Sequence, residues 1–261
     1  MSRQFQGKQV LVTGAGQGIG YEIAHRFARA GAGVVLNDID RELAESAANN
    51  IRKETDSQSV WGLDGDIGSL EEIDQLMAQS LSHLGSLDIL IANAGITHFG
   101  PFLETQPQDV ARLLAVNIQG SFFCAQAAAR DMIKHQKAGR ILLMSSVTGV
   151  QAHQNLSAYG ITKAALRMMA RTLALELGAY GITVNALGPG ATLTQRTEAD
   201  GDTYARGWAG VAPNGRVGQV EDVAEAAVFL CSPEARHITG ETLMIDGGWT
   251  IYSPLPPGEV D

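Results

Sequence analysis

The residues with the clearest potential for chemistry are a tyrosine and a lysine four positions apart, Tyr159 and Lys163. On a helix this spacing places both side chains on one face, one turn apart. A phenol has an unperturbed pKa of about 10, and a neighbouring ammonium lowers that pKa because it favours the phenolate. The pair therefore suits general acid/base chemistry near neutral pH. The same spacing also occurs by chance in many helices, so this interpretation needs support from other residues.

A serine pair precedes the tyrosine at the end of an apolar run. Residues 141–144 are apolar and predict a buried strand, and Ser145 and Ser146 follow it directly. A serine hydroxyl at the carboxyl end of a strand can donate a hydrogen bond to a substrate oxygen. The serines and the Tyr–Lys pair together indicate a site that handles a proton and holds an oxygen atom.

A glycine-rich turn follows the first predicted strand, residues 9–13. Gly14, Gly18 and Gly20 are spaced Gly-x-x-x-Gly-x-Gly, and a helical pattern covers residues 21–30. Glycines between a strand and a helix let the backbone approach a pyrophosphate, whose charge then lies at the helix amino end. A simple tight turn would have the same composition, but the strand–turn–helix context favours a dinucleotide site.

An aspartate ends the second predicted strand, residues 33–37. Asp38 lies about 20 residues beyond the glycines, where a carboxylate accepts bonds from the adenosine ribose hydroxyls and repels a 2′-phosphate. Gln17, and neither Arg nor Lys, stands beside the glycines. Both observations favour NAD over NADP. The alternative is that Asp38 caps the helix predicted over 41–53.

Strand and helix patterns continue to alternate along the chain. Further strands are predicted over residues 58–63, 87–91, 139–146, 181–187 and 241–245. Further helices are predicted up to residue 84, with Ser69 and Glu72 as a capping box, over 105–135 with interruptions at Asn117 and Gly120, and over 157–179 and 220–230. This order requires a parallel sheet with helices on both faces and ligands at its carboxyl edge. We predict a single doubly wound α/β domain of about seven strands over residues 1–261.

Two segments do not follow this alternation. Residues 191–218 combine weak periodicity with several glycines and polar residues, and we interpret them as a mobile substrate lid; the alternative is an ordinary surface excursion. Residues 253–261 contain three prolines and are predicted to form an extended tail.

Composition excludes several classes of protein. Hydrophobic residues make up 45% of the 261, and the net charge of −9 disfavours nucleic acid or an anionic membrane as a partner. There is no apolar run of the roughly 18 residues that a membrane helix needs, and the amino end lacks the apolar region of a signal peptide. Cys124 and Cys231 have no ligand-type neighbours, so they are expected to be buried, reduced thiols in a cytoplasmic protein without a metal site.

These motifs together resemble the short-chain dehydrogenase/reductase family, and the resemblance covers residues 7–248. The motifs in order are residues 13–20, Asp66-Ile67, Asn93-Ala94-Gly95, Asn117, Ser146, Tyr159-x-x-x-Lys163, Pro189-Gly190 and Asp246-Gly247-Gly248. The departures are small: Ala92 replaces a more usual Asn, and Gly188 precedes Pro189 where Ala or Asn is commoner. Within the family, the chain resembles the sugar and polyol dehydrogenases and the 3-oxoacyl reductases.

The resemblance implies a Rossmann-like fold that moves a hydride between a nicotinamide and an alcohol or carbonyl carbon. Tyr159 would take the hydroxyl proton, Lys163 would lower its pKa and hold the nicotinamide ribose, and Ser146 would bind the substrate oxygen. Ser146 is preferred to Ser145 because it lies thirteen residues before the tyrosine. Asn117 would position a water that relays the proton to solvent.

The resemblance also implies the cofactor and substrate contacts. Asp66 and Asn93 would border the adenine and its ribose, and Thr192 or Thr194 would contact the carboxamide or the pyrophosphate. The expected cofactor residues are Gly14, Gln17, Gly18, Ile19, Gly20, Asp38, Asp66, Ile67, Asn93, Gly95, Tyr159, Lys163, Pro189, Gly190, Thr192 and Thr194. The expected substrate residues are Ser146, His98, His153, Asn155 and Tyr159.

The expected substrate residues are polar, and a polar pocket favours a sugar, polyol or sugar acid as substrate. Reduction of a 3-oxoacyl thioester is the alternative, and a dinucleotide-binding protein without turnover is a third possibility. The helical patterns over 105–135 and 157–179 carry more apolar residues than one buried stripe needs. A homodimer or homotetramer that pairs these helices would bury them, as members of the family do; the alternative is that they are core.

Overall fold

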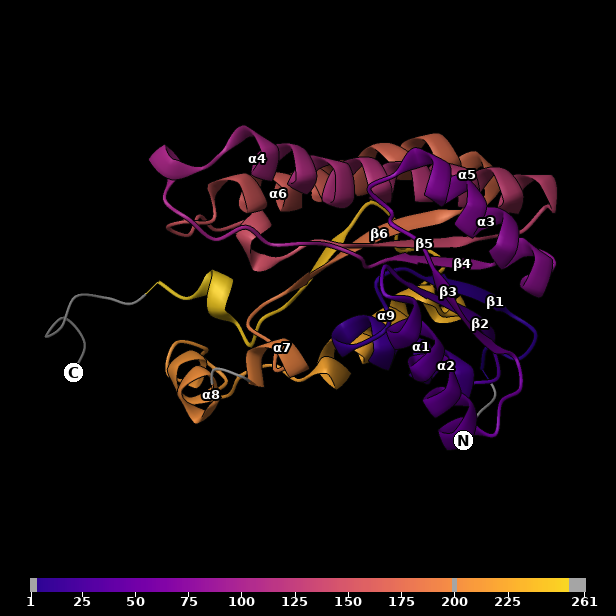
Figure 1. Ribbon diagram of the computed structural model, residues 1–261, viewed down its shortest axis with the longest axis horizontal. Helices are drawn as coiled ribbons and strands as arrows, with labels where there is room; N and C mark the ends of the chain where they lie inside the picture. Colours follow the sequence, from indigo (N-terminus) through magenta and orange to yellow (C-terminus); the bar gives the residue numbers. More distant parts are fainter. Residues whose placement is uncertain (1–3, 199–200, 254–261) are drawn as a thin grey trace, which may run out of the picture.

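The computed structural model describes residues 4–198 and 201–253, and its centre is one parallel sheet (Figure 1). The seven strands have the order β3-β2-β1-β4-β5-β6-β7, and every neighbouring pair is parallel. The predicted doubly wound parallel sheet is therefore confirmed. The strands are β1 (Gln9–Val12), β2 (Gly33–Asp38), β3 (Val60–Asp64), β4 (Ile89–Ala92), β5 (Arg140–Met144), β6 (Thr183–Pro189) and β7 (Thr242–Ile245).

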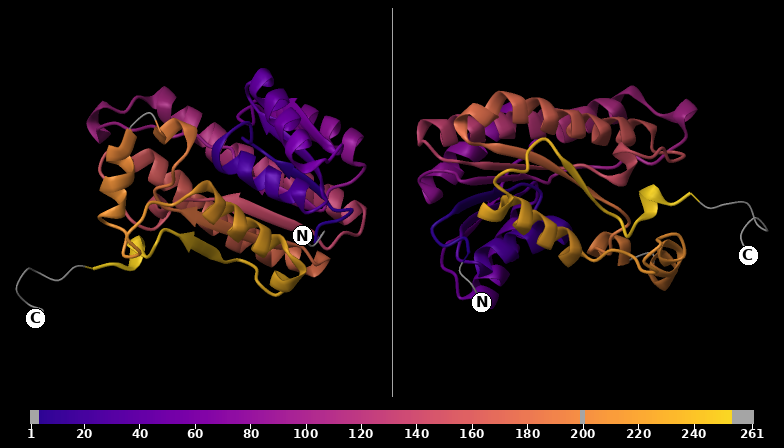
Figure 2. Two further views of the ribbon diagram at one scale, coloured as in Figure 1. Left: turned by 90° about the horizontal axis from the view of Figure 1, so that it is seen from below. Right: turned by 180° about the vertical axis from the view of Figure 1, so that it is seen from behind.

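Helices cover both faces of this sheet (Figures 1 and 2). One layer contains α1 (Gly18–Arg29), α2 (Arg41–Thr55) and α9 (Val220–Cys231). The other contains α3 (Leu70–Leu84), α4 (Pro107–Leu113), α5 (Ser121–Lys134) and α6 (Ser157–Leu177). Short 3-10 turns complete the chain: η1 (Phe102–Glu104), η3 (Val147–Gly149), η4 (Gly178–Tyr180), η5 (Pro233–Ala235) and η6 (Trp249–Ile251).

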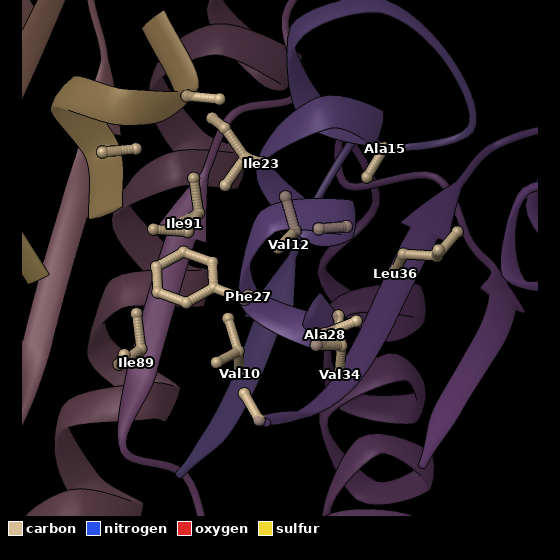
Figure 3. Close-up of a cluster of buried hydrophobic side chains, with 14 of the residues drawn as sticks. Val10, Val12, Ala15, Ile23, Phe27, Ala28, Val34, Leu36, Ile89 and Ile91 are labelled. Atoms are coloured by element: carbon tan, nitrogen blue, oxygen red, sulfur yellow. The ribbon is translucent and has the colours of Figure 1, made fainter. Parts of the chain in front are cut away.

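Each helical layer encloses its own hydrophobic core. In the first core, Phe27 of α1 packs among valines and isoleucines of β1 and β4, all of them essentially inaccessible to water (Figure 3). Every residue of β4 is buried, because a strand covered on both faces exposes neither set of its side chains. The continuous apolar runs in the sequence are the consequence of this double cover.

The sixth strand extends further than its sequence indicates. It was predicted to end at residue 187, but β6 continues through Gly188 and Pro189, which pair with Met244 and Ile245 of β7. A proline lacks the N–H that a strand ladder requires. Here the bond to the Ile245 carbonyl is made by the N–H of Gly190, at 2.9 Å, so the ladder does not need a donor at Pro189.

The predicted interruption of the long helix at Asn117 and Gly120 is confirmed. The segment between α4 and α5, Leu114–Gly120 (η2), is π-helical. A Cβ on Gly120 would lie 2.5 Å from the carbonyl oxygen of Ile67, so only glycine lets this turn approach the loop after β3. The wide turn brings Asn117 into the interior, where it is completely buried.

The predicted capping box at α3 forms only in part. Ser69 Oγ accepts a bond from the Glu72 N–H at 3.4 Å, as expected. The Glu72 carboxylate does not return to the Ser69 N–H; it accepts a bond from the N–H of Asp66 at 2.8 Å. The reason is that the Ser69 N–H already donates to the Asp66 carbonyl, at 2.9 Å. Glu72 therefore fixes the loop that carries Asp66.

The predicted lid consists of two short helices, α7 (Gln195–Glu198) and α8 (Gly201–Ala209), below the sheet in Figure 1. Backbone bonds close the base of this excursion: the Leu193 N–H donates to the Gly218 carbonyl at 2.9 Å, and the Gly218 N–H donates to the Ala191 carbonyl at 3.0 Å. Its motion stays a prediction. The extended tail predicted for 253–261 lies outside the described residues apart from Ser253. No described helix has the length and apolarity to cross a membrane.

Both cysteines are buried and unpaired, as expected. Burial raises the pKa of each thiol, Cys124 and Cys231, to about 12. Because the thiolate is the reactive form, we expect neither cysteine of the folded protein to react with a disulfide reagent at about pH 8, whereas both react after unfolding in guanidinium. The measurement is the release of the reagent's chromophore. One equivalent released rapidly from the folded protein would contradict the prediction.

Candidate active site

A cleft of about 580 Å³ opens at the carboxyl ends of the strands and collects residues from all parts of the chain. Strands of a parallel sheet end at the same edge, so the loops that follow them meet there. Every residue expected to hold the cofactor lines this cleft. These residues are Gly14, Gln17, Gly18, Ile19, Gly20, Asp38, Asp66, Ile67, Asn93, Gly95, Tyr159, Lys163, Pro189, Gly190, Thr192 and Thr194.

The glycine-rich turn is packed so closely that a side chain cannot be added. A Cβ on Gly20 would lie 2.4 Å from the Gly14 carbonyl oxygen and 2.5 Å from Asn93 Nδ2. The Asn93 amide explains this proximity, since it donates to the carbonyls of Thr13, at 3.0 Å, and Gly14, at 2.7 Å. Both amide hydrogens of Asn93 thus brace the turn, and its Oδ1 is the atom left for a ligand.

Asp38 lies beside the same turn and does not cap α2. Its carboxylate accepts bonds from the Gly16 N–H at 3.0 Å and the Asp40 N–H at 3.3 Å. The cap of α2 is Asp40, whose side chain accepts from the Leu43 N–H at 3.1 Å. The capping interpretation of Asp38 is therefore wrong, and its carboxylate is placed in the cleft wall.

Asp66 is held by an arginine that the sequence analysis did not predict. Arg112 of α4 contacts the carboxylate of Asp66 at 2.8 and 3.0 Å, and the Gly68 N–H donates to it at 2.8 Å. Partial burial by itself would raise the pKa of Asp66, but Arg112 and the Gly68 N–H outweigh burial and lower it. The carboxylate is therefore ionised at neutral pH. No local signal links the two residues, because they lie 46 positions apart.

The two serines after β5 have different partners. The Ser145 hydroxyl donates to the carbonyl of Lys163 at 2.7 Å, so its hydrogen serves the packing of α6 against β5. The Ser146 hydroxyl accepts a bond from the Thr148 N–H at 3.2 Å, which leaves its own hydrogen for another acceptor. Only a hydroxyl with a hydrogen to donate can hold a substrate oxygen. This geometry supports the choice of Ser146.

Tyr159 and Lys163 lie in the first two turns of α6, and the lysine is almost wholly buried. Lys163 Nζ is 5.5 Å from the centre of the Tyr159 ring and donates to the Met144 carbonyl at 2.7 Å. Desolvation lowers the pKa of Lys163, and the attraction of Tyr159 opposes this effect. A Cβ on Gly95 would lie 3.1 Å from Nζ, so glycine leaves room for the ammonium.

Asn117 does not line the cleft but connects two segments that do. Its amide makes two bonds to the backbone of Ile96, at 2.8 and 2.9 Å, and donates to Thr162 Oγ1 at 3.0 Å. Thr162 in turn donates to the Tyr159 carbonyl at 2.7 Å. Both amide hydrogens are used, so the side chain acts here as a brace for the first turn of α6, which carries Tyr159. The water relay stays a prediction, and the amide can contribute to it only through its oxygen.

Three of the expected substrate residues are held by contacts outside the lining of the cleft. His98 Nε2 is 3.9 Å from Asp109 Oδ2, and Asn155 accepts a bond from the Gly100 N–H through its carbonyl, at 2.9 Å. His153 packs against Trp249, with 4.9 Å between the ring centres. None of the three is among the described residues that line the cleft, whereas Ser146 and Tyr159 are. Direct contact of His98, His153 and Asn155 with a substrate stays a prediction.

The lid contributes cleft residues that local reasoning did not assign to the cofactor. Gln195 Oε1 accepts a bond from the Gly18 N–H at 3.1 Å, and Arg196, Thr197 and Tyr204 also line the cleft. The sequence shows no basic residue beside the glycines, but the fold brings Arg196 into the same cleft. Further lining residues that were not assigned to the cofactor are Asn37, Ile39, Gly65, Ala94, Ile96, Thr97, Arg112, Val116, Met144 and Ser145.

Comparisons with known proteins agree with this architecture. The profile of a protein family described as "Enoyl-(Acyl carrier protein) reductase" matches residues 14–250. A short-chain dehydrogenase/reductase of Armillaria gallica is 36% identical over 251 residues, which is 93% of this chain and 96% of the relative. The L-rhamnose-1-dehydrogenase of Scheffersomyces stipitis is 34% identical over 252 residues, which is 95% of this chain and 98% of the relative.

Solved structures of similar proteins contain either form of the dinucleotide. A gluconate 5-dehydrogenase from Burkholderia cenocepacia, in complex with NADP and tartrate, is 33% identical with a TM-score of 0.89, and the match covers 96% of this chain and 98% of that one. A 3-ketoacyl-(acyl-carrier-protein) reductase from Brucella melitensis, complexed with NADH, is 33% identical with a TM-score of 0.88, and the match covers 94% and 99% of the two chains.

Proposed function

Because this chain belongs to the short-chain dehydrogenase/reductase family of oxidoreductases, we propose that it transfers a hydride between NAD and a carbon that carries an alcohol or carbonyl group. We infer that the substrate is a sugar, polyol or sugar acid. The similarity to an L-rhamnose-1-dehydrogenase and to a gluconate 5-dehydrogenase supports this substrate class. The observation that carries the proposal is the meeting of Ser146, Tyr159 and Lys163 with the glycine-rich turn in one cleft.

The cleft fits a dinucleotide. At Gly20 the space that a Cβ would fill is already occupied by backbone and by Asn93, so only glycine lets the turn fold this tightly at the cleft wall. The N–H of Gly18, at the amino end of α1, is directed at an oxygen atom, that of Gln195. A pyrophosphate oxygen can replace that amide oxygen, since the start of a helix favours negative charge. Asp38 and the Oδ1 of Asn93 would accept bonds from ribose hydroxyls.

The residues of this chain would handle the proton and the oxygen. In the oxidation direction, Tyr159 as phenolate takes the hydroxyl proton of the substrate, and Ser146 donates a hydrogen bond to the same oxygen. Lys163 supplies positive charge beside the phenol and lies close to Gly95 at the cleft wall. A nicotinamide cofactor held in this cleft would supply the acceptor for the hydride of the substrate carbon. In reduction, Tyr159 returns its proton to the oxygen.

The cofactor preference provides a first prediction. Two like charges about 4 Å apart near a protein surface repel by roughly 4 kcal/mol before screening by salt, and even half of this corresponds to about 30-fold in affinity. We therefore expect kcat/KM to favour NAD over NADP by at least about 30-fold, and Asp38→Ala to reduce this ratio about tenfold or more. The measurement is steady-state kinetics with both cofactors.

Asp40→Ala is the matched control, because it removes a carboxylate two residues away that caps α2. We expect it to lower the free energy of unfolding by about 1 kcal/mol and to leave the cofactor ratio unchanged. A wild-type preference for NADP would contradict the assignment of Asp38. It would direct attention to Arg196, the cation that the lid brings into the cleft.

Reduction of a 3-oxoacyl thioester is the second candidate. The similarity to a 3-ketoacyl reductase favours it, and so does an apolar surface after β4, where Phe99, Phe102 and Leu103 are 68, 75 and 93% exposed. The same loop contributes Ile96 and Thr97 to the cleft. An acyl chain could lie against these side chains. The net charge of −9 opposes docking of an acidic carrier protein, so we place this candidate second.

A substrate panel decides between the candidates. NADH formation is measured with sugars, polyols and sugar acids, and NADH consumption with a 3-oxoacyl ester. Turnover of the first group supports the proposal, and turnover of the ester alone supports the second candidate. Dinucleotide binding without turnover of any compound in the panel would indicate a non-catalytic binding protein.

We also propose that the chain assembles as a homodimer or homotetramer. A groove of about 450 Å³ on α4, η2 and α5 is lined by apolar side chains and Gln119, and two of the apolar ones, Leu114 and Phe122, are exposed. On α6, Met168 and Leu175 are exposed as well. A second copy of the chain would cover both faces with apolar surface of the same kind. Static light scattering at assay concentration tests this proposal, and a monomeric mass would contradict it.

A further inference from the structure

Four rings from three separate segments, one of them the lid helix α8, meet in one cluster. Trp208 of α8 lies 4.8 Å from Trp249 of η6, centre to centre, and His153 lies 4.9 Å from Trp249. Tyr204, one turn before Trp208, is 6.1 Å from it. All four side chains are partly exposed. We call His153, Tyr204, Trp208 and Trp249 the aromatic cluster.

The cluster reaches the cleft through Tyr204. Tyr204 lines the same cleft as Tyr159, and His153 lies six residues before Tyr159 in the loop that leads into α6. Figure 1 shows α8 and the segment that follows β7 at the same end of the sheet, and the second panel of Figure 2 agrees. The cluster therefore lies where the part of a substrate remote from the reacting carbon would extend.

The turn that carries Trp249 is held firmly. Asp246 accepts bonds from the Gly248 N–H at 2.9 Å, from the Thr250 N–H at 2.8 Å and from the Thr250 hydroxyl at 2.6 Å. The Asn214 N–H, just after the lid helices, donates to the Gly247 carbonyl at 3.1 Å. The side chain of Trp249 is thus held in place before a ligand binds. The bond from Asn214 connects the end of the lid to the same turn.

Polar atoms beside the cluster lack partners among the described residues. His153 Nε2 and Gln151 Oε1 are both buried, and neither has a hydrogen-bond partner there. Buried polar atoms in proteins almost always have a hydrogen-bond partner. Two such atoms without a partner therefore indicate a bound ligand or an ordered water. Burial lowers the pKa of His153, which leaves the imidazole neutral at pH 7 and able either to donate or to accept a bond from a hydroxyl.

We propose that the aromatic cluster is a sugar subsite that receives the C–H face of a ring-form aldose while His153 binds one of its hydroxyls. The inference rests on the proposed function and specifies its substrate class. The C–H bonds of a sugar ring face carry slight positive charge, and the face of an aromatic ring is negative, so the two attract. A flexible acyl chain has no rigid ring face to stack on these aromatic side chains. An open-chain polyol has no flat C–H face to stack.

Tryptophan emission tests binding without turnover. The chain has three tryptophans, and Trp61 lies in β3, stacked on His83, so Trp61→Phe leaves only the two of the cluster. In the double variant Trp61→Phe/Tyr159→Phe, with NAD present, L-rhamnose, D-glucose, D-galactose and D-xylose are titrated. We expect at least one aldose to change the emission saturably, and sorbitol to have little effect. No response to any of the four aldoses would overturn the proposal.

Kinetics test the contribution of each ring to catalysis. With the aldose that responds, Trp208→Leu and His153→Leu should each raise KM about tenfold or more, with kcat and the Kd for NAD within about threefold of wild type. Trp208→Phe, which keeps an aromatic face, should remain within about threefold in KM. Trp61→Leu is the matched control that leaves the cluster intact.

The outcomes separate this proposal from the proposed function. If the wild type oxidises aldoses but Trp208→Leu, Trp249→Leu and His153→Leu all leave KM unchanged, the subsite is refuted and the oxidoreductase assignment stands. If the wild type uses only a 3-oxoacyl ester, both are refuted. A preference for sorbitol over every aldose refutes the ring-form substrate alone.

Discussion

Replacing Tyr159 with phenylalanine is expected to lower kcat about 10³-fold and to leave the Kd for NAD within about threefold of wild type. The ring remains in place over Lys163, so the substitution removes only the oxygen that exchanges the proton. The measurement combines steady-state NADH formation with calorimetric titration of NAD. Separating turnover from binding distinguishes loss of the acid/base group from loss of the site.

Tyr180→Phe is the control for this experiment. Tyr180 is 55% exposed, lies in η4 after the end of α6 and does not line the cleft. We expect its removal to change neither kcat nor the Kd for NAD. Unchanged turnover in Tyr159→Phe would contradict the role of Tyr159 in proton transfer, and the proposed mechanism would then be wrong.

Replacing Lys163 with methionine is expected to separate activity from stability. The substitution removes the positive charge beside Tyr159, and we expect kcat/KM to fall by about 10²–10⁴. Burying an ammonium is costly, and replacing such a group with an apolar side chain of similar length is often neutral or stabilising. We therefore expect the free energy of unfolding at pH 7, from urea titration, to stay within about 1 kcal/mol of wild type or to rise.

The pH dependence of stability gives an independent check on Lys163. Because desolvation lowers its pKa in the folded protein, the unfolded chain binds more protons between that lowered value and the ordinary value of about 10.5. Stability then rises with pH across this window. The difference in unfolding free energy, wild type minus Lys163→Met, should increase as the pH approaches about 10.5. A flat difference would show that the lysine is not desolvated by folding.

Most of the sheet could be predicted from the sequence, because its strands are buried on both faces and therefore appear as continuous apolar runs. The errors occurred where a partner elsewhere in the chain decides the structure. Pro189 seemed to end β6, but the donor at Gly190 allows β7 to pair past it. Glu72 seemed to complete a cap, but the N–H of Asp66 is its partner.

Residue types and spacing by themselves indicated the proposed chemistry: a phenol and an ammonium one helical turn apart, a serine after a strand, and glycines before a helix. These signals are local because each depends on a single strand, turn or helix. The tertiary structure alone decided which hydroxyl of Ser145 and Ser146 keeps its hydrogen, that Arg112 holds Asp66, and that the lid brings Arg196 and Tyr204 to the cleft. Each of these depends on contacts between residues far apart in the chain, which periodicity and spacing do not encode.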